Sequence, residues 1–223
     1  MTRRQESIDR KYLILCEGLD AYNFLVAYLN SDALQYDCRF NTGIQCWNFE
    51  GITQLSGHIK RLKRMDHFLE VKSILVIRDA ETSVESAEDS IKAALRNNAL
   101  PVPVCCNQWD NSGEPRIAYT LFPACCEPLR TGALEDLCWD ILADDKASEY
   151  RKDVQLFLNQ INGKYQSIMT HEHKGRLHTY FSVKDELVTL KLGEAAKHKA
   201  FDWRHKRLEP LRRLIVQGFE EET

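Results

Sequence analysis

Short apolar runs alternate with amphipathic stretches along the first hundred residues of the chain. Uninterrupted apolar and β-branched side chains predict buried strands at residues 11–16 (KYLILC) and 71–79 (VKSILVIRD), and residues 38–49 are also strand-like. Helices are predicted where apolar residues recur at helical spacing, at residues 20–30, 51–65 and 83–98. Ser83 is a candidate N-cap of the last of these helices. Alternating strands and helices predict βαβ units and a largely parallel sheet.

The pattern changes after residue 98. Residues 99–123 are rich in proline and contain the turn sequence DNSGEP, which suggests a hairpin or an edge strand followed by a strand at residues 117–122. A short helix is expected after Gly132. Residues 146–217 are mainly helical, with predicted interruptions at NGK (162–164) and HEHKGRLH (171–178). We therefore expect an α/β core over residues 1–145 and a helical C-terminal extension, residues 146–223, packed on it.

Composition favours a globular chain without a membrane partner. Of the 223 residues, 43% are hydrophobic and 28% charged, and no apolar run approaches the length of a membrane span. The charged N-terminus has no apolar signal segment, so a cytoplasmic location is expected. The eight cysteines include no C-x-x-C pair and are expected to be reduced. A zinc site built from the two adjacent cysteine pairs is disfavoured, because neighbouring side chains on a strand face opposite ways.

Positive charge is concentrated in the C-terminal third. Residues 161–217 contain 12 Lys and Arg against 6 Asp and Glu, although the whole chain carries a net charge of −3. This bias suggests a polyanionic partner, and a solvated helix surface explains it equally well. The basic runs at residues 57–65 and 197–213 are candidates for contacts with nucleic-acid phosphates, with the same alternative.

Acidic residues follow two of the predicted strands. Glu17 ends the first strand, and Asp79 and Glu81 follow the strand at residues 71–79. Ligands of open α/β sheets gather at the carboxyl ends of parallel strands. Glu135 and Asp136 begin the helix after Gly132 and add a third acidic group. Together these carboxylates suit a hard cation such as Mg²⁺, although each alone is also explained as a helix-entry or capping acid.

Two of these stretches resemble a known family. LCEGLDAYNFL (residues 15–25) and ILVIRDAET (residues 74–82) resemble the TOPRIM fold shared by topoisomerases, DnaG-type primases and OLD-family (overcoming lysogenization defect) nucleases. The signature of that fold is an acid–glycine pair after the first strand and D-x-D after the third. The segments YTLFPACCEPLRTGALEDLCWDIL, KGRLHTYFS and LGEAAKHKAFDW extend the resemblance to small stand-alone TOPRIM proteins related to OLD nucleases. The resemblance implies a TOPRIM/Rossmann-like, mainly parallel sheet flanked by helices.

The resemblance also implies phosphodiester chemistry on DNA or RNA that depends on Mg²⁺ or Mn²⁺. Its metal ligands would be Glu17, Asp79, Glu81 and Glu135, of which Glu17 and Asp79 would also be catalytic, with Asp20 and Asp136 as secondary ligands. OLD-type sites add a basic residue from the C-terminal part, which Lys174 or Arg176 would supply to neutralise transition-state charge. Glu81 replaces the second aspartate of D-x-D, so its side chain reaches further than the family pattern.

These residues leave three functional readings open. The first is a nuclease or other phosphotransferase acting as an anti-phage effector. The second is a non-catalytic module that binds nucleotides or nucleic acid and whose carboxylates hold one structural metal. The third is a scaffold whose acids dock a basic partner. A Walker A motif is absent, so any ATPase in such a system would be a separate polypeptide. Whether the chain forms a homo-oligomer is left open.

Overall fold

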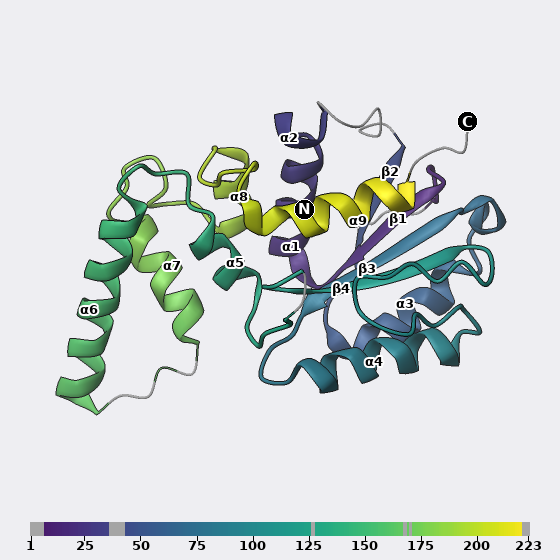
Figure 1. Cartoon of the computed structure of the whole chain (residues 1–223), viewed down its shortest axis with the longest axis horizontal. Helices are drawn as coiled ribbons and strands as arrows, with labels where there is room; N and C mark the ends of the chain where they lie inside the picture. The colour runs from purple at the N-terminus through teal and green to yellow at the C-terminus, as the bar shows by residue number, and fades with distance from the viewer. Residues whose placement is uncertain (1–6, 36–42, 126–127, 167–168, 170, 220–223) are drawn as a thin grey trace.

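A four-stranded parallel sheet forms the centre of the protein (Figure 1). The computed structural model describes residues 7–35, 43–125, 128–166, 169 and 171–219. The strands are β1 (Tyr12–Cys16), β2 (Ile44–Asn48), β3 (Ser73–Asp79) and β4 (Arg116–Phe122). They lie in the order β2-β1-β3-β4. The predicted α/β, Rossmann-like class with a largely parallel sheet is confirmed.

Helices cover both faces of this sheet. Because successive strand side chains point to opposite faces, Leu13 and Leu15 join one buried cluster while Ile14 and Cys16 join the other. The face of Leu13 is covered by α3 (Leu55–Leu62) and α4 (Val84–Asn97). The face of Ile14 is covered by α1 (Gly18–Leu29), α5 (Leu134–Asp140), α8 (Leu192–Lys197) and α9 (Glu209–Phe219). The sheet is therefore the middle of three layers.

The C-terminal part is helical and shares the core of the sheet. Leu211, Ile215 and Phe219 of α9 belong to the same buried cluster as Ile14, so no separate core exists for α9. In Figure 1, α6 (Ala147–Tyr165) and α7 (Glu172–Ser182) form a pair that projects to one side of the sheet. The short elements are α2 (Asp32–Gln35) and the 3₁₀ turns η2 (Ile52–Gln54), η3 (Phe68–Glu70) and η4 (Lys206–Leu208).

Most predicted elements are present, and two predicted helix interruptions are wrong. The Ser83 hydroxyl accepts the Ser86 N–H at 3.1 Å, which confirms the N-cap of α4. NGK, however, lies inside α6, because a glycine there costs only about 1 kcal/mol while Leu158 and Val154 are buried about one and two turns earlier. HEHKGRLH begins α7 rather than interrupting a helix, and the burial of Leu177 anchors it.

Other expectations are met in part or lie outside the described residues. The proline-rich segment makes one antiparallel bridge, Asp110 to Ile117, and β4 is the edge strand. Of the predicted strand-like stretch at residues 38–49, only the part from residue 43 is described, and β2 lies within it. Six cysteines are free thiols, whereas Cys38 and Cys126 lie outside the described residues. No helix of the described chain is both long and apolar enough to cross a membrane.

Candidate functional site

The sheet order places the acidic strand ends at a topological switch point. The chain runs from β1 outward to β2 and then returns to place β3 on the other side of β1. Such a reversal opens a crevice beyond the carboxyl ends of the two central strands, where α/β proteins bind ligands. Glu17 follows β1, and its N–H donates to the carbonyl of Ile77 in β3 at 3.2 Å. Asp79 is the last residue of β3. Both acids therefore lie at this edge.

The entry to α1 is fixed by a residue that the sequence analysis missed. The Asn48 side-chain oxygen, at the end of β2, accepts the N–H of Gly18 at 2.9 Å and that of Glu50 at 2.8 Å. Gly18 has φ +87°, a conformation that side chains other than glycine rarely adopt. The glycine of the acid–glycine pair is thus required by the backbone turn from β1 into α1. Asn48 could have been suspected as a polar residue ending a strand at the same edge.

Glu17 has a cationic neighbour that was also missed. Its carboxylate lies 3.4 Å from Nε of Arg78, whose side chain is only 3% exposed. Burial lowers the pKa of Arg78, and the charges of Glu17, Asp79 and Glu81 oppose this shift. Arg78 interrupts the apolar run of β3, and this buried charge was the available sequence signal. Arg78 offsets part of the negative charge at the strand ends.

Asp79 has a strongly raised pKa. Its Oδ1 accepts the Leu134 N–H at the start of α5, at 2.9 Å. Burial raises the pKa of Asp79 well above its ordinary value, and the charges of Glu135, Glu17 and Glu81 raise it further. Glu17, Glu81 and Glu135 are therefore each within electrostatic range of Asp79. Their negative charges repel that of Asp79, which is only partly exposed to water, whereas Glu81 is itself exposed.

A backbone bridge joins the end of β3 to the start of α5. Glu81 and Gly132 exchange two N–H to carbonyl hydrogen bonds, each 2.8 Å long. Asp136 then caps α5, because its Oδ2 accepts the Ala133 N–H at 2.9 Å. Gly132 has φ +126°, and a Cβ there would lie 2.5 Å from that same oxygen. This bridge and cap hold Glu81 and Glu135 on the same side as Asp79.

We expect Gly132→Ala to destabilise the protein by about 2–3 kcal/mol, because it combines an unfavourable φ with a clash against the Asp136 cap. The measurement is urea unfolding of both proteins. Gly57→Ala is the matched control: Gly57 lies exposed in α3, and nothing lies within 4 Å of its added Cβ. The control should gain up to about 1 kcal/mol, because alanine is the better helix former. Equal effects of the two substitutions would contradict this account of Gly132.

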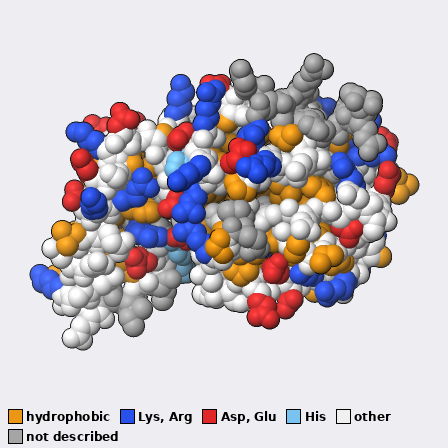
Figure 2. Space-filling view, in the orientation of Figure 1, with side chains coloured by type: hydrophobic (Ala, Val, Ile, Leu, Met, Phe, Trp, Pro, Cys, Tyr) orange, Lys and Arg blue, Asp and Glu red, His pale blue; other side chains and the backbone are white. Residues whose placement is uncertain are grey.

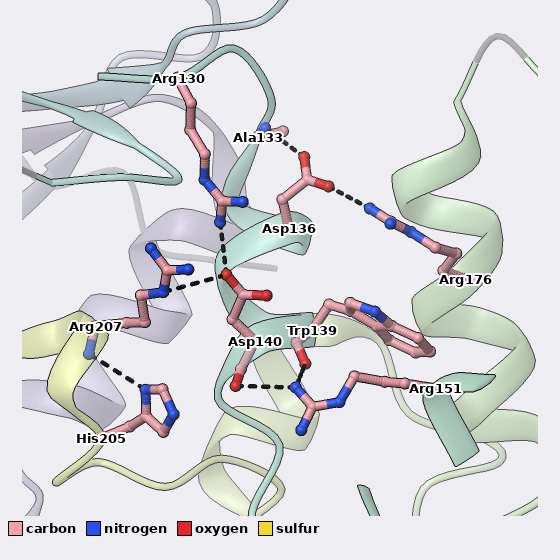
Figure 3. Close-up of polar contacts among 9 residues, drawn as sticks. All are labelled: Arg130, Ala133, Asp136, Trp139, Asp140, Arg151, Arg176, His205 and Arg207. Carbon is pink, nitrogen blue, oxygen red and sulfur yellow. Dashed lines mark hydrogen bonds and ion pairs between the residues drawn. The ribbon is translucent and has the colours of Figure 1, made fainter. Parts of the chain in front are cut away.

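The basic candidates reach α5 from α7. Arg176 forms an ion pair with Oδ1 of Asp136, so both oxygens of this carboxylate are engaged (Figure 3). Lys174 Nζ lies 3.7 Å from Oε1 of Glu135, and its side chain is 53% exposed. Arg176 therefore holds α7 against α5. Lys174 places a half-exposed ammonium group beside Glu135.

Asp20 has a mainly structural position. Its Oδ1 accepts the Gly193 N–H at the start of α8, at 3.1 Å. Burial and the charges of Glu135, Asp20 and Asp79 raise the pKa of the Cys138 thiol, so Asp20 acts on the same thiol as two acids of the site. Asp20 and Asp136 thus border the cluster as helix caps, whereas Asp79 lies inside it.

His178 is exposed on α7, with its ring edge-on to Phe181.

The carboxylate oxygens of these acids are chemically suited to bind a divalent cation. A cation would relieve the repulsion that raises the Asp79 pKa, and carboxylate oxygens are the ligands that Mg²⁺ and Mn²⁺ prefer. Among the described residues, however, no three His, Cys, Asp or Glu side chains are grouped so that they could hold an ion as they stand. Glu17 is paired with Arg78 and Glu135 with Lys174. Binding an ion would require these two glutamates to turn from their present partners.

Comparison with known proteins gives a family and no assigned activity. No curated protein and no solved structure matches the chain. The family model described as "Protein of unknown function (DUF3226)" matches residues 11–220. The chain belongs to this family, and the match includes all strands of the sheet and every acidic and basic residue of the site.

Proposed function

We propose that this DUF3226 protein carries out phosphodiester chemistry on nucleic acid with a divalent metal, as an OLD-like TOPRIM nuclease. The observation that carries this proposal is the position of Asp79: a partly buried carboxylate at the switch point, whose pKa is raised by burial and by the charges of Glu135, Glu17 and Glu81. Like charges held close together cost stability, and such clusters are typical of functional sites. The resemblance of the acid–glycine and D-x-E motifs to TOPRIM enzymes supports the same chemistry and a role in anti-phage defence.

The residues divide into three roles. Glu17, Asp79, Glu81 and Glu135 would hold Mg²⁺ or Mn²⁺, which would supply an activated water and charge stabilisation at the phosphoryl group. Lys174 can move its ammonium from Glu135 toward a bound phosphate, because it is half exposed and its contact with Glu135 is long. Arg176, Asp136 and Asp20 position α5, α7 and α8 around the acids.

A non-catalytic binding module with a structural metal is the second candidate. The ion pairs of Glu17 with Arg78 and of Glu135 with Lys174 favour it, because with these two glutamates engaged fewer carboxylates are left as ligands, which suits one ion better than two. The longer Glu81 in place of aspartate also fits this reading. Such a module would bind metal and nucleic acid and leave the strand intact.

The test is a cleavage assay on labelled single-stranded DNA, duplex DNA and RNA. We expect the wild-type chain to cut at least one substrate in Mn²⁺ or Mg²⁺ and none in EDTA. ATP alone should not change the rate, because the chain has no Walker A motif. Intact substrates under all conditions, with or without an added ATPase partner, together with metal binding in calorimetry, would establish the binding module instead.

A further inference from the structure

Two arginines from distant segments share one carboxylate at the end of α5. Arg130 Nη2 lies 2.6 Å from Oδ2 of Asp140, and Arg207 Nε lies 3.6 Å from the same oxygen. Figure 3 shows the two guanidinium groups approaching Asp140 from different sides. A single carboxylate neutralises only one of these two charges. The arrangement therefore holds two guanidinium groups close together with one unbalanced positive charge.

These guanidinium groups remain available to a ligand. The side chains of Arg130 and Arg207 are 41% and 44% exposed, and each guanidinium has five N–H donors, most of which Asp140 does not use. Arg151 places a third positive charge at the same end of α5. Its Nη1 donates to the carbonyls of Trp139 and Asp140 at 3.0 and 3.1 Å. Asp140 thus fixes the positions of Arg130 and Arg207 without neutralising their combined charge.

The arginine group continues toward the acid cluster. One turn earlier on α5, Asp136 holds Arg176, and the preceding residue, Glu135, holds Lys174. Figure 2 shows Lys and Arg side chains gathered over the position of α5 in the orientation of Figure 1. Four cations, Arg130, Arg207, Arg176 and Lys174, therefore follow α5 from its last turn to its first. Their row ends at Glu135, beside Asp79.

We propose that this row, the α5 cationic row, binds the phosphate backbone of a nucleic-acid strand and leads it to the acid cluster. The inference rests on the proposed function, because it names the path of the strand that would be cleaved. The paired N–H donors of a guanidinium match the spacing of phosphate oxygens, and a row of arginines can contact successive phosphates of one strand. Trp139 lies beneath Arg176 and is only 7% exposed, so this ring does not offer a base-stacking surface. Recognition along the row is therefore of the backbone and independent of base sequence.

The test measures binding in EDTA, so that neither metal nor cleavage enters. Affinity for fluorescein-labelled 20-nucleotide single-stranded and duplex DNA is measured by anisotropy over a range of salt concentrations. Arg130→Gln combined with Arg207→Gln should weaken binding about 10-fold or more at low salt, and should flatten the slope of log K against log salt for the duplex by about 1.8. The matched control is Lys72→Gln with Arg96→Gln, which removes the same charge from exposed residues just before β3 and on α4, outside the basic runs at residues 57–65 and 197–213.

The outcomes separate this inference from the proposed function. The control should bind within about 2-fold of wild type, and Arg130→Lys with Arg207→Lys should keep most of the affinity, because it retains the charge. Thermal melting of each variant excludes loss of fold. Wild-type affinity in the Gln variant, an equal loss in the Lys72 and Arg96 control, or no DNA binding by the wild-type chain would overturn the cationic row. If a strand binds through the row and is never cut, the binding inference holds and the proposed nuclease function is wrong.

Discussion

Asp79→Asn is expected to abolish metal-dependent cleavage and, in EDTA, to stabilise the fold. The amide keeps the size of the side chain, and its oxygen can still accept the Leu134 N–H that Oδ1 of Asp79 accepts at 2.9 Å. The negative charge and one oxygen donor are lost. A direct ligand matters more than the supporting groups around it, whose removal typically costs 10–100-fold, so we expect a loss greater than about 100-fold.

The gain in stability follows from the environment of Asp79. Burial and three neighbouring carboxylates raise its pKa, so the fold favours the neutral form more than the unfolded chain does. Stability from this group is present at low pH and is lost as the pH rises through the folded-state pKa. At pH 8 the Asn variant should therefore be more stable than wild type by about 1–2 kcal/mol, or roughly 2–8 °C in Tm. The difference should shrink as the pH falls.

Bound metal should make wild type more stable than Asp79→Asn. Mn²⁺ at about 100 times its Kd adds roughly 2.7 kcal/mol to a protein that binds it only when folded. Wild type should show this shift in thermal melting, and Asp79→Asn should lose it. Asp110→Asn is the control, because Asp110 is a turn residue next to the amino end of β4, away from the site. A Mn²⁺ shift that survives in Asp79→Asn would show that the metal binds elsewhere.

The acidic strand ends were predictable because the signals are local. An apolar β-branched run that stops at an acid indicates both a buried strand and its carboxyl end, and the alternation with helices indicates that such ends share one edge. Glu17, Asp79 and Glu81 followed from these two facts. The start of α5 was likewise marked by Gly132 and the acids after it.

The partners of these acids depend on contacts between distant segments. Arg78 was visible as a charge in an apolar strand, but its pairing with Glu17 arises only when β3 lies beside β1. Asp136 is a cap by its sequence position, yet its ion pair with Arg176 bridges 40 residues. Arg130, Asp140 and Arg207 come from a loop, a helix end and a 3₁₀ turn, and no periodicity links them. The sequence thus indicated where the acids lie and not which cations balance them.

Lys174→Ala is expected to separate catalysis from binding. Bond cleavage adds negative charge at the phosphoryl oxygens, and a placed ammonium stabilises that charge more than it stabilises the bound strand. Removing such a group typically lowers turnover about 10²–10³-fold. Binding should weaken far less than turnover, because the three arginines of the α5 cationic row still hold the backbone. The measurement is single-turnover cleavage in Mn²⁺ together with DNA affinity in EDTA.

Two companion variants decide what the lysine contributes. Lys174→Arg retains the positive charge and should recover part of the turnover, since the guanidinium is less compact and its position beside Glu135 differs. Lys152→Ala removes the same charge from an exposed position on α6 and should leave turnover and affinity unchanged. If Lys174→Ala instead lowers affinity and turnover by the same factor, the lysine belongs to the binding row alone. Full activity in Lys174→Ala would mean that another cation stabilises the negative charge of the transition state. Arg176 could do so only by leaving Asp136, and this would weaken the cap of α5.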